Sequence, residues 1–228
     1  MAVELNGVVT WGRSFNDYVR MFALDEKDLQ KKILGAGDGP ACFNADLSKM
    51  GGQVLSVDPL YSLPVDEIEA KIKAVEQNLR RQITDDRKEF NFWPLASKEE
   101  YFVQKLSAME TFLGDYNDGR SEGRYITGEL PLLPFNDRQF ELSLSSNFLF
   151  LYSDHLSAQF HIDSVAELCR VSDEVRLYPL VDFTGNKSKH LERVIHSIGK
   201  MGCLIEIRDV DYRLAVDGGT KMMVVQSP

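Results

Sequence analysis

A cluster of three glycines lies early in the chain, in the segment Gly35-Ala36-Gly37-Asp38-Gly39. A short apolar run leads into the cluster, and a segment of helical composition, PACFNADLSKM, follows it. Glycines at a strand-to-helix turn let the backbone bend sharply and approach a ligand without a Cβ collision, while the first helical amides point toward that ligand. The cluster therefore predicts a ligand-binding loop, although purely structural turns also use glycine.

A carboxylate follows the glycine cluster at a sequence separation that suits a nucleoside-binding site. Asp58 ends the apolar run QVLSVDP, 21 residues beyond Gly37, and Pro59 closes that run. A carboxylate at this place can accept hydrogen bonds from both ribose hydroxyls of an adenosine. Asp-Pro also opens turns, but the combination with the glycines favours ribose binding. The dinucleotide fingerprint counted from Gly35 requires Gly or Ala where Pro40 stands, so NAD fits less well.

Strand and helix patterns alternate along the chain and position these residues. Seven apolar runs predict strands, at residues 31–37, 53–59, 124–129, 140–152, 174–183, 203–212 and 221–226. Apolar residues at helical spacing predict helices over residues 15–29, 40–50, 157–171 and 190–202. Asp217-Gly218-Gly219 is a hairpin signal that makes the last two strands antiparallel. The chain is therefore predicted to be an α/β protein.

The stretch from residue 62 to residue 118 is rich in Glu, Lys, Arg and Gln, with Ile68, Ile72 and Leu79 at helical spacing. It predicts long helices, broken at Trp93-Pro94. A crossover between parallel strands usually carries one helix with short connections. We therefore interpret this stretch as an inserted helical lid, or alternatively as a homodimer interface.

The composition is that of a globular protein. The 228 residues suffice for one domain, over residues 1–228, with 43% hydrophobic and 27% charged residues. The net charge of -9 argues against nucleic-acid binding, which needs clustered cations. A local basic group is the exception to this acidic total, and it consists of Arg80, Arg81, Arg87 and Lys88.

Cys42, Cys169 and Cys203 are widely spaced among apolar residues, which predicts reduced core thiols rather than disulfides or a metal site. No apolar run approaches the roughly 20 residues that span a bilayer. The N-terminus lacks a basic region followed by an apolar stretch. We therefore expect a cytoplasmic protein that does not contact membranes.

The segment GELPLLPFNDRQFELSLSSNFLF closely resembles the class I S-adenosylmethionine-dependent methyltransferase family. In that family an acidic residue ends strand three, LPF follows, and a phenylalanine-acidic pair, here Phe140-Glu141, opens strand four. The similarity spans roughly residues 32–151 apart from the helical insertion. It implies a Rossmann-like seven-stranded, mostly parallel sheet with an antiparallel last strand, helices on both faces, and the helical insertion between strands 2 and 3.

The resemblance also implies S-adenosylmethionine as cofactor and a set of residues that contact it. The glycines form the first motif, Asp58 is the ribose-binding acid, and Glu129 receives the adenine amino group beside the Leu130 amide. The end of strand four meets the methionyl part. The expected cofactor contacts are Gly35, Ala36, Gly37, Asp58, Pro59, Glu129, Leu130, Ser145 and Ser146.

This sequence departs from the family pattern at two positions. Ile33 stands where the family often has an acid two residues before the first glycine, and Glu129 stands where it has Asp. The missing acid removes a partner for the ammonium group of the cofactor. Asp38, or Tyr18 on the preceding helix, is a candidate to compensate.

Methyl transfer is an in-line displacement, so a catalytic side chain is optional and none is assigned. A general base, where the acceptor requires one, would come from the four histidines, of which His155 lies nearest the expected cleft. No group of residues has metal-ligand spacing. The aromatic residues of the insertion are candidates to line an acceptor site or its own core: Phe90, Phe92 and Trp93.

The expected function is methyl transfer to a small-molecule acceptor. A non-catalytic S-adenosylmethionine-binding or scaffold protein is the main alternative, because a fold does not establish a function. An NAD-dependent oxidoreductase would share the glycine loop and Asp58, but Pro40 and the LPF segment argue against it.

Overall fold

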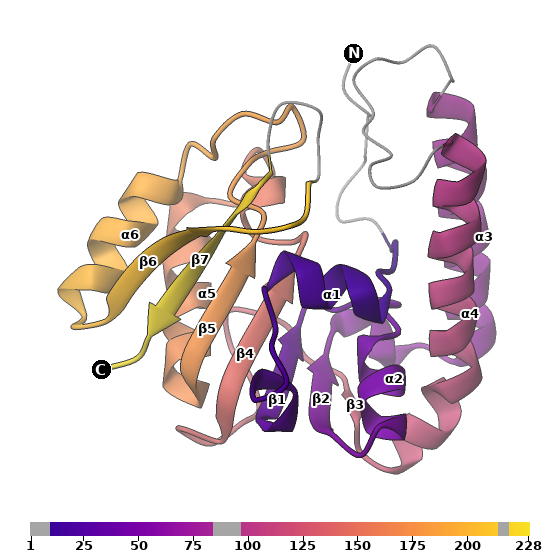
Figure 1. Ribbon diagram of the computed structural model, residues 1–228, viewed down its shortest axis with the longest axis horizontal. Helices are drawn as coiled ribbons and strands as arrows, with labels where there is room; N and C mark the ends of the chain where they lie inside the picture. Colours follow the sequence, from indigo (N-terminus) through magenta and orange to yellow (C-terminus); the bar gives the residue numbers. More distant parts are fainter. Residues whose placement is uncertain (1–9, 84–96, 214–218) are drawn as a thin grey trace.

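A seven-stranded sheet forms the centre of the computed structural model, which describes residues 10–83, 97–213 and 219–228. The strands lie in the order β3-β2-β1-β4-β5-β7-β6. All neighbours from β3 to β5 are parallel, whereas β7 is antiparallel to both β5 and β6 (Figure 1). The strands are β1 Lys32–Ala36, β2 Gln53–Val57, β3 Tyr125–Ile126, β4 Phe140–Ser146, β5 Ser172–Tyr178, β6 Leu204–Asp209 and β7 Lys221–Gln226. The predicted fold class is confirmed.

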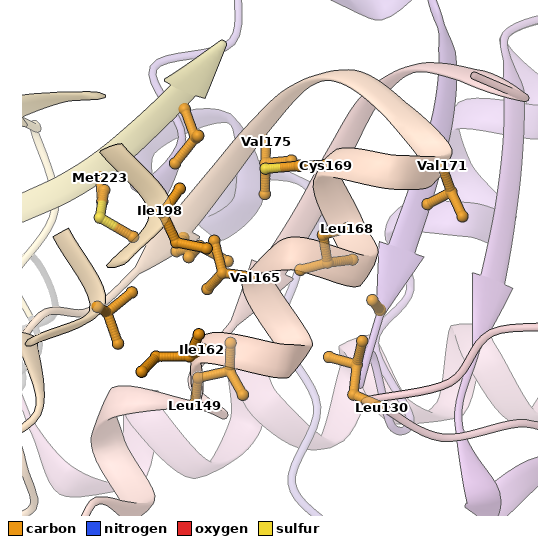
Figure 2. Close-up of a cluster of buried hydrophobic side chains, with 14 of the residues drawn as sticks. Leu130, Leu149, Ile162, Val165, Leu168, Cys169, Val171, Val175, Ile198 and Met223 are labelled. Atoms are coloured by element: carbon orange, nitrogen blue, oxygen red, sulfur yellow. The ribbon is translucent and has the colours of Figure 1, made fainter. Parts of the chain in front are cut away.

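Helices cover both faces of the sheet. On one face lie α5 (Ala158–Val171) and α6 (Leu191–Lys200), whose residues Val165 and Ile198 pack with Val175 and Met223 of the sheet (Figure 2). On the other face lie α1 (Phe15–Met21) and α2 (Phe43–Lys49). The central strands β1 and β4 are buried on both faces, as is usual for parallel strands that have helices on both sides. The three cysteines are buried and unbridged, as expected.

The first helix is shorter than the sequence pattern predicts. A capping box between Ser14 and Asp17 begins α1, but the helix ends at Met21 and Ala23 is left-handed, with φ of 47°. Asp25 and Asp28 then hydrogen-bond to each other's backbone amides, and a separate 3-10 helix spans Asp28–Gln30. The prediction of one helix over residues 15–29 is therefore wrong in its second half, because these local side-chain bonds compete with helical ones.

Two long helices stand beside β3: α3 (Val65–Gln82) and α4 (Lys98–Ser121). Their upper turns rise past the carboxyl ends of β1 and β2 (Figure 1). The lower half of α4 packs through Phe112 and Tyr116 on Tyr125 of β3, so it also serves as the crossover helix. The predicted break at Trp93-Pro94 and the aromatic residues around it lie outside the described residues. Among the described helices, none is long and apolar enough to span a membrane.

A buried ion pair joins α1 to α4. The Lys105 ammonium donates to the Asp17 carboxylate, and the two residues are 2% and 5% exposed. Burial lowers the pKa of Lys105 to about 8. Burial would raise the pKa of Asp17, but Lys105 and the Ser14 amide outweigh it, so that pKa is lowered. The pair ties the helical insertion to the helix that precedes β1.

Replacing Lys105 by Met should strongly destabilise the fold, because the Asp17 charge stays buried without its partner. We expect the free energy of unfolding in urea to fall by about 3–5 kcal/mol. The double variant Asp17→Asn/Lys105→Met should recover much of that loss. Lys73→Met, which breaks an exposed pair with Glu69 on α3, should change it by less than about 1 kcal/mol. Equal effects of the two single variants would contradict this interpretation.

Candidate cofactor-binding site

The strand register brings the predicted site residues to one edge of the sheet. Ala36 at the end of β1 lies beside Val57 of β2, and Val57 lies beside Ile126 of β3. On the other side, Gly35 lies beside Leu144 of β4. The order of connections reverses between β1 and β4, and α/β sheets bind ligands at such switch points. The carboxyl edge therefore carries, in sequence across the sheet, Glu129, Asp58, the glycine loop and Ser145.

The glycine loop needs its glycines for backbone reasons. Gly37 and Gly39 have φ of 69° and 54°, in the left-handed region that side chains make costly. The Gly37 amide donates to the Val57 carbonyl at 2.9 Å, which ties the loop to β2. A Cβ on Gly39 would meet no atom within 4 Å. The loop is thus anchored on its inner side and open at Gly39.

Asp58 links the glycine loop to the turn after β2. Its carboxylate oxygens accept hydrogen bonds from the amides of Gly39 at 2.9 Å and Leu60 at 2.8 Å. Burial raises the pKa of Asp58, and these two bonds act against the rise. Pro59 begins the 3-10 helix that Asp58 caps, and it is exposed. The structure thus shows the capping role, and a carboxylate with two bonds keeps further lone pairs for a ligand.

Asp38 folds back over the end of β1. Its carboxylate accepts hydrogen bonds from the Tyr18 hydroxyl at 2.7 Å and from the Ser56 hydroxyl at 2.6 Å. The Ser146 hydroxyl donates in turn to the Tyr18 oxygen at 3.0 Å. A Cβ at Gly35 would lie 1.8 Å from an Asp38 oxygen, so the first glycine is needed to admit this carboxylate. The two candidates for the missing acid, Asp38 and Tyr18, are therefore bonded to each other.

Sequence reasoning missed two members of this network. Ser56 binds Asp38 from β2, and the Asn44 side-chain amide of α2 donates to the Ser56 hydroxyl at 3.1 Å. Both residues are 1% exposed. A serine inside the otherwise apolar strand QVLSV was the available signal, because buried hydroxyls need partners.

The pKa of Asp38 reflects its surroundings. Burial raises this pKa from 3.8 to about 6, the hydrogen bonds from Ser56 and Tyr18 act downward, and the nearby Asp58 charge acts upward. Asp38 and Asp58 thus place two carboxylates against the glycine loop. The site is therefore acidic, and it favours a ligand with positive charge over one with negative charge.

The end of β4 supplies the other side of the site. Ser145 is 2% exposed, and its hydroxyl has no hydrogen-bond partner in the described protein. Asn147 follows in a left-handed conformation with φ of 50°, and the Phe148 ring lies 3.0 Å from where a Gly37 Cβ would be. A buried unpaired hydroxyl is rare enough in native proteins to point to a missing partner.

The remaining predicted contacts differ in exposure. Glu129 is exposed, and its backbone forms an isolated antiparallel β-bridge with Leu132. Leu130 is 6% exposed and belongs to the core on the α5 face. Ala36 is buried at the end of β1. Glu129 can therefore reach a ligand through its side chain, and Leu130 only through its backbone.

Two of the four histidines, His161 and His190, face backbone carbonyl groups, whereas His155, the base candidate expected nearest the cofactor, is exposed. His161 is fully buried, and its ring nitrogens face the carbonyl oxygens of Ser157 and Leu149 at 2.7 and 2.9 Å. One nitrogen of His190 faces the carbonyl oxygens of Ser153 and Leu156. His161 thus has no ring nitrogen left to act as a base. Across residues 10–83, 97–213 and 219–228, no group of three or more His, Cys, Asp or Glu side chains is arranged to hold a metal.

The strand order, the reversed β7 and the glycine loop followed by Asp58 define a class I methyltransferase fold. No family model matches the chain. An uncharacterised protein of Methanocaldococcus jannaschii is 33% identical to this chain, over an alignment that covers 98% of each chain. The chain belongs to the same family as this archaeal protein.

Solved structures of methyltransferases are similar at low identity. A methyltransferase of Methanosarcina mazei is 12% identical, with 90% of this chain and 94% of that chain covered and a TM-score of 0.48. Magnesium protoporphyrin IX methyltransferase of Synechocystis is 10% identical, with 93% and 81% covered and a TM-score of 0.49. Similarity at this level says nothing about the acceptor.

The raised pKa of Asp38 predicts a pH-dependent stability. The folded state favours the protonated form of Asp38. The contribution of Asp38 to the free energy of unfolding is therefore fully present below its unfolded pKa of 3.8 and is lost as pH rises through about 6. At neutral pH the ionised group should cost about 3 kcal/mol, from about 1.36 kcal/mol for each pKa unit. Asp38→Asn should lack this cost. Unfolding free energies of variant and wild type, measured between about pH 4 and 7.5, should diverge accordingly, and parallel curves would refute the assignment.

Proposed function

We propose that this protein is an S-adenosylmethionine-dependent methyltransferase that acts on a small-molecule acceptor. The observation that carries the proposal is the pair of carboxylates, Asp38 and Asp58, held against an open glycine loop at the switch point of the sheet. S-adenosylmethionine carries a sulfonium and an ammonium group as well as a ribose. An acidic cradle complements those cations and can bind the ribose hydroxyls.

The same charges argue against a dinucleotide. The pyrophosphate of NAD binds where backbone amides at a helix N-terminus are free to receive an anion. Here the Gly39 amide already donates to Asp58, and the Asp38 carboxylate is buried within the loop. An anion at this place would face two carboxylates. The site therefore favours a cationic cofactor over an anionic one.

The residues present fit the cofactor at four points. Gly39 leaves open space where a side chain would project, so a ligand can approach the backbone there. Two backbone amides hold Asp58 in a fixed orientation, and its carboxylate would accept hydrogen bonds from the ribose hydroxyls. Ser145 has a buried hydroxyl that lacks a partner and would bind the methionyl part. Glu129, exposed at the far end of the edge, would receive the adenine amino group.

Asp38 is well placed to replace the acid that is absent at Ile33. Alternate residues of a strand share a face, so Ile33 and Gly35 lie on the same side of β1, and the Asp38 carboxylate covers Gly35 on that side. Tyr18 and Ser56 orient its two oxygens. Asp38 would thus hold the ammonium group electrostatically, without direct exposure to water.

When bound, the cofactor supplies an electrophilic methyl group. The contribution of the chain is to align the acceptor with that group and to exclude water. The upper turns of α3 and α4 rise past the carboxyl ends of β1 and β2 (Figure 1), which suits the proposed role of residues 62–118 as a lid over the acceptor. No described histidine is required, because displacement at a sulfonium needs no catalytic side chain.

Calorimetric titration of the purified protein should detect S-adenosylmethionine and S-adenosylhomocysteine. Asp58→Ala should weaken binding by about 10- to 100-fold, the loss expected for charged hydrogen bonds worth about 1.5–3 kcal/mol. Asp173→Ala, which removes an exposed acid at the amino end of β5 and thus at the edge of the sheet away from the glycine loop, should bind the cofactor normally. Thermal melts would verify that both variants fold. Binding of NADH with no response to either sulfur ligand would overturn the proposal.

Turnover separates an enzyme from a cofactor-binding scaffold. Incubation with S-adenosylmethionine and a mixed metabolite extract should produce S-adenosylhomocysteine well above the no-extract blank, and Asp58→Ala should produce much less. Tight cofactor binding without any extract-dependent product would instead indicate a non-catalytic binding protein.

A further inference from the structure

The two outer strands of the sheet, β3 and β6, differ in how their edges are covered. At one end β3 is covered by α4, whereas at the other end no described strand pairs with the outer edge of β6. Every residue of β6 is exposed except the half-buried Ile205. Leu204 is 74% exposed and Ile207 is 38% exposed. An unpaired edge with exposed apolar side chains is a template for pairing with another strand.

The hydrogen bonds of β6 show which residues offer free backbone groups. The Val210 amide donates inward to the Thr220 carbonyl, continuing the ladder in which Asp209 lies opposite Lys221. Backbone groups of successive residues in an antiparallel ladder point alternately to the two sides. Even-numbered residues therefore bond to β7, and Ile205, Ile207 and Asp209 direct their amide and carbonyl groups outward.

The charges of β6 select one register for pairing with a second copy. In a two-fold antiparallel pair centred on Ile207, Glu206 of one copy lies opposite Arg208 of the other, twice. Centring the pair one residue earlier would place Glu206 opposite Glu206, and one residue later Arg208 opposite Arg208. Opposite charges across strands stabilise a pair, and like charges destabilise it. Of these three registers, only the one centred on Ile207 avoids both repulsions and places Glu206 opposite Arg208.

The apolar residues fit the same register. On the face that carries Glu206 and Arg208, Leu204 lies opposite Val210 of the other copy at both ends of the pair. On the other face the two Ile207 side chains meet at the two-fold axis, where their outward amides and carbonyls form a reciprocal hydrogen-bonded pair. Asp209 lies opposite Ile205 there and keeps its ion pair with Lys221 of its own chain.

We propose that two copies of this chain associate through β6, in antiparallel register centred on Ile207, to form one continuous sheet. The two-fold axis is then perpendicular to the sheet, so the carboxyl edges of the two copies point in opposite directions. Each copy keeps a separate and complete cofactor site. The association thus does not depend on the proposed activity, and it leaves α3 and α4 free at the distal ends.

Sedimentation or light scattering of the full chain tests this proposal. The wild-type protein should have the mass of a dimer at micromolar concentrations. Arg208→Glu should weaken the association at least about tenfold, because it places Glu opposite Glu twice. The double variant Glu206→Arg/Arg208→Glu should restore the dimer, since the exchanged charges are again complementary. Lys73→Glu makes the same charge change on an exposed face of α3 and should not alter the mass.

A second variant tests the backbone pairing. Ile207→Pro removes the outward amide and leaves the bonds of β6 to β7 in place, because proline is tolerated where the amide faces away from the ladder. It should give a folded monomer, with folding verified by thermal melts. A monomeric wild-type protein, a dimer that persists in both Arg208→Glu and Ile207→Pro, or a double charge exchange that stays monomeric would each overturn the proposal.

Discussion

The burial of the Asp38 carboxylate is the constraint around which the carboxyl edge of the sheet is arranged. A carboxylate removed from water needs hydrogen-bond donors, and here they come from the helix before β1, through Tyr18, and from β2, through Ser56. Gly35 must lack a side chain to make room. Gly35 thus makes room for the Asp38 side chain, whereas Gly37 and Gly39 allow a left-handed backbone conformation.

This constraint extends outward through α1. Tyr18 holds the inner side of that helix to Asp38 and stacks on Phe43 of α2, with ring centroids 4.7 Å apart. The adjacent Asp17 holds its outer side to Lys105 of α4. One short helix therefore connects the glycine loop to the helical insertion.

The core residues of the proposed site were predictable because their signals are local. Gly35, Gly37 and Asp58 follow one another at strand ends, and the parallel register of β1 and β2 brings such ends together in any sheet of this kind. Strand and helix identities were predictable for the same reason, since buried parallel strands and amphipathic helices each have a characteristic period. The prediction of an α/β protein rests on these local patterns, whereas the seven-stranded, mostly parallel sheet was implied by the resemblance to the methyltransferase family.

The sequence by itself thus determined the order of the elements and the glycines and acid at the edge of the sheet. Only the tertiary structure decided that Asp38 accepts hydrogen bonds from Tyr18 and Ser56, that Arg176 donates to the Phe22 carbonyl, and that β6 presents an open edge. These hydrogen bonds join residues 18 to 154 positions apart. No pattern within one element can specify them, because hydrogen bonds and strand pairing between distant segments depend on how the whole chain packs.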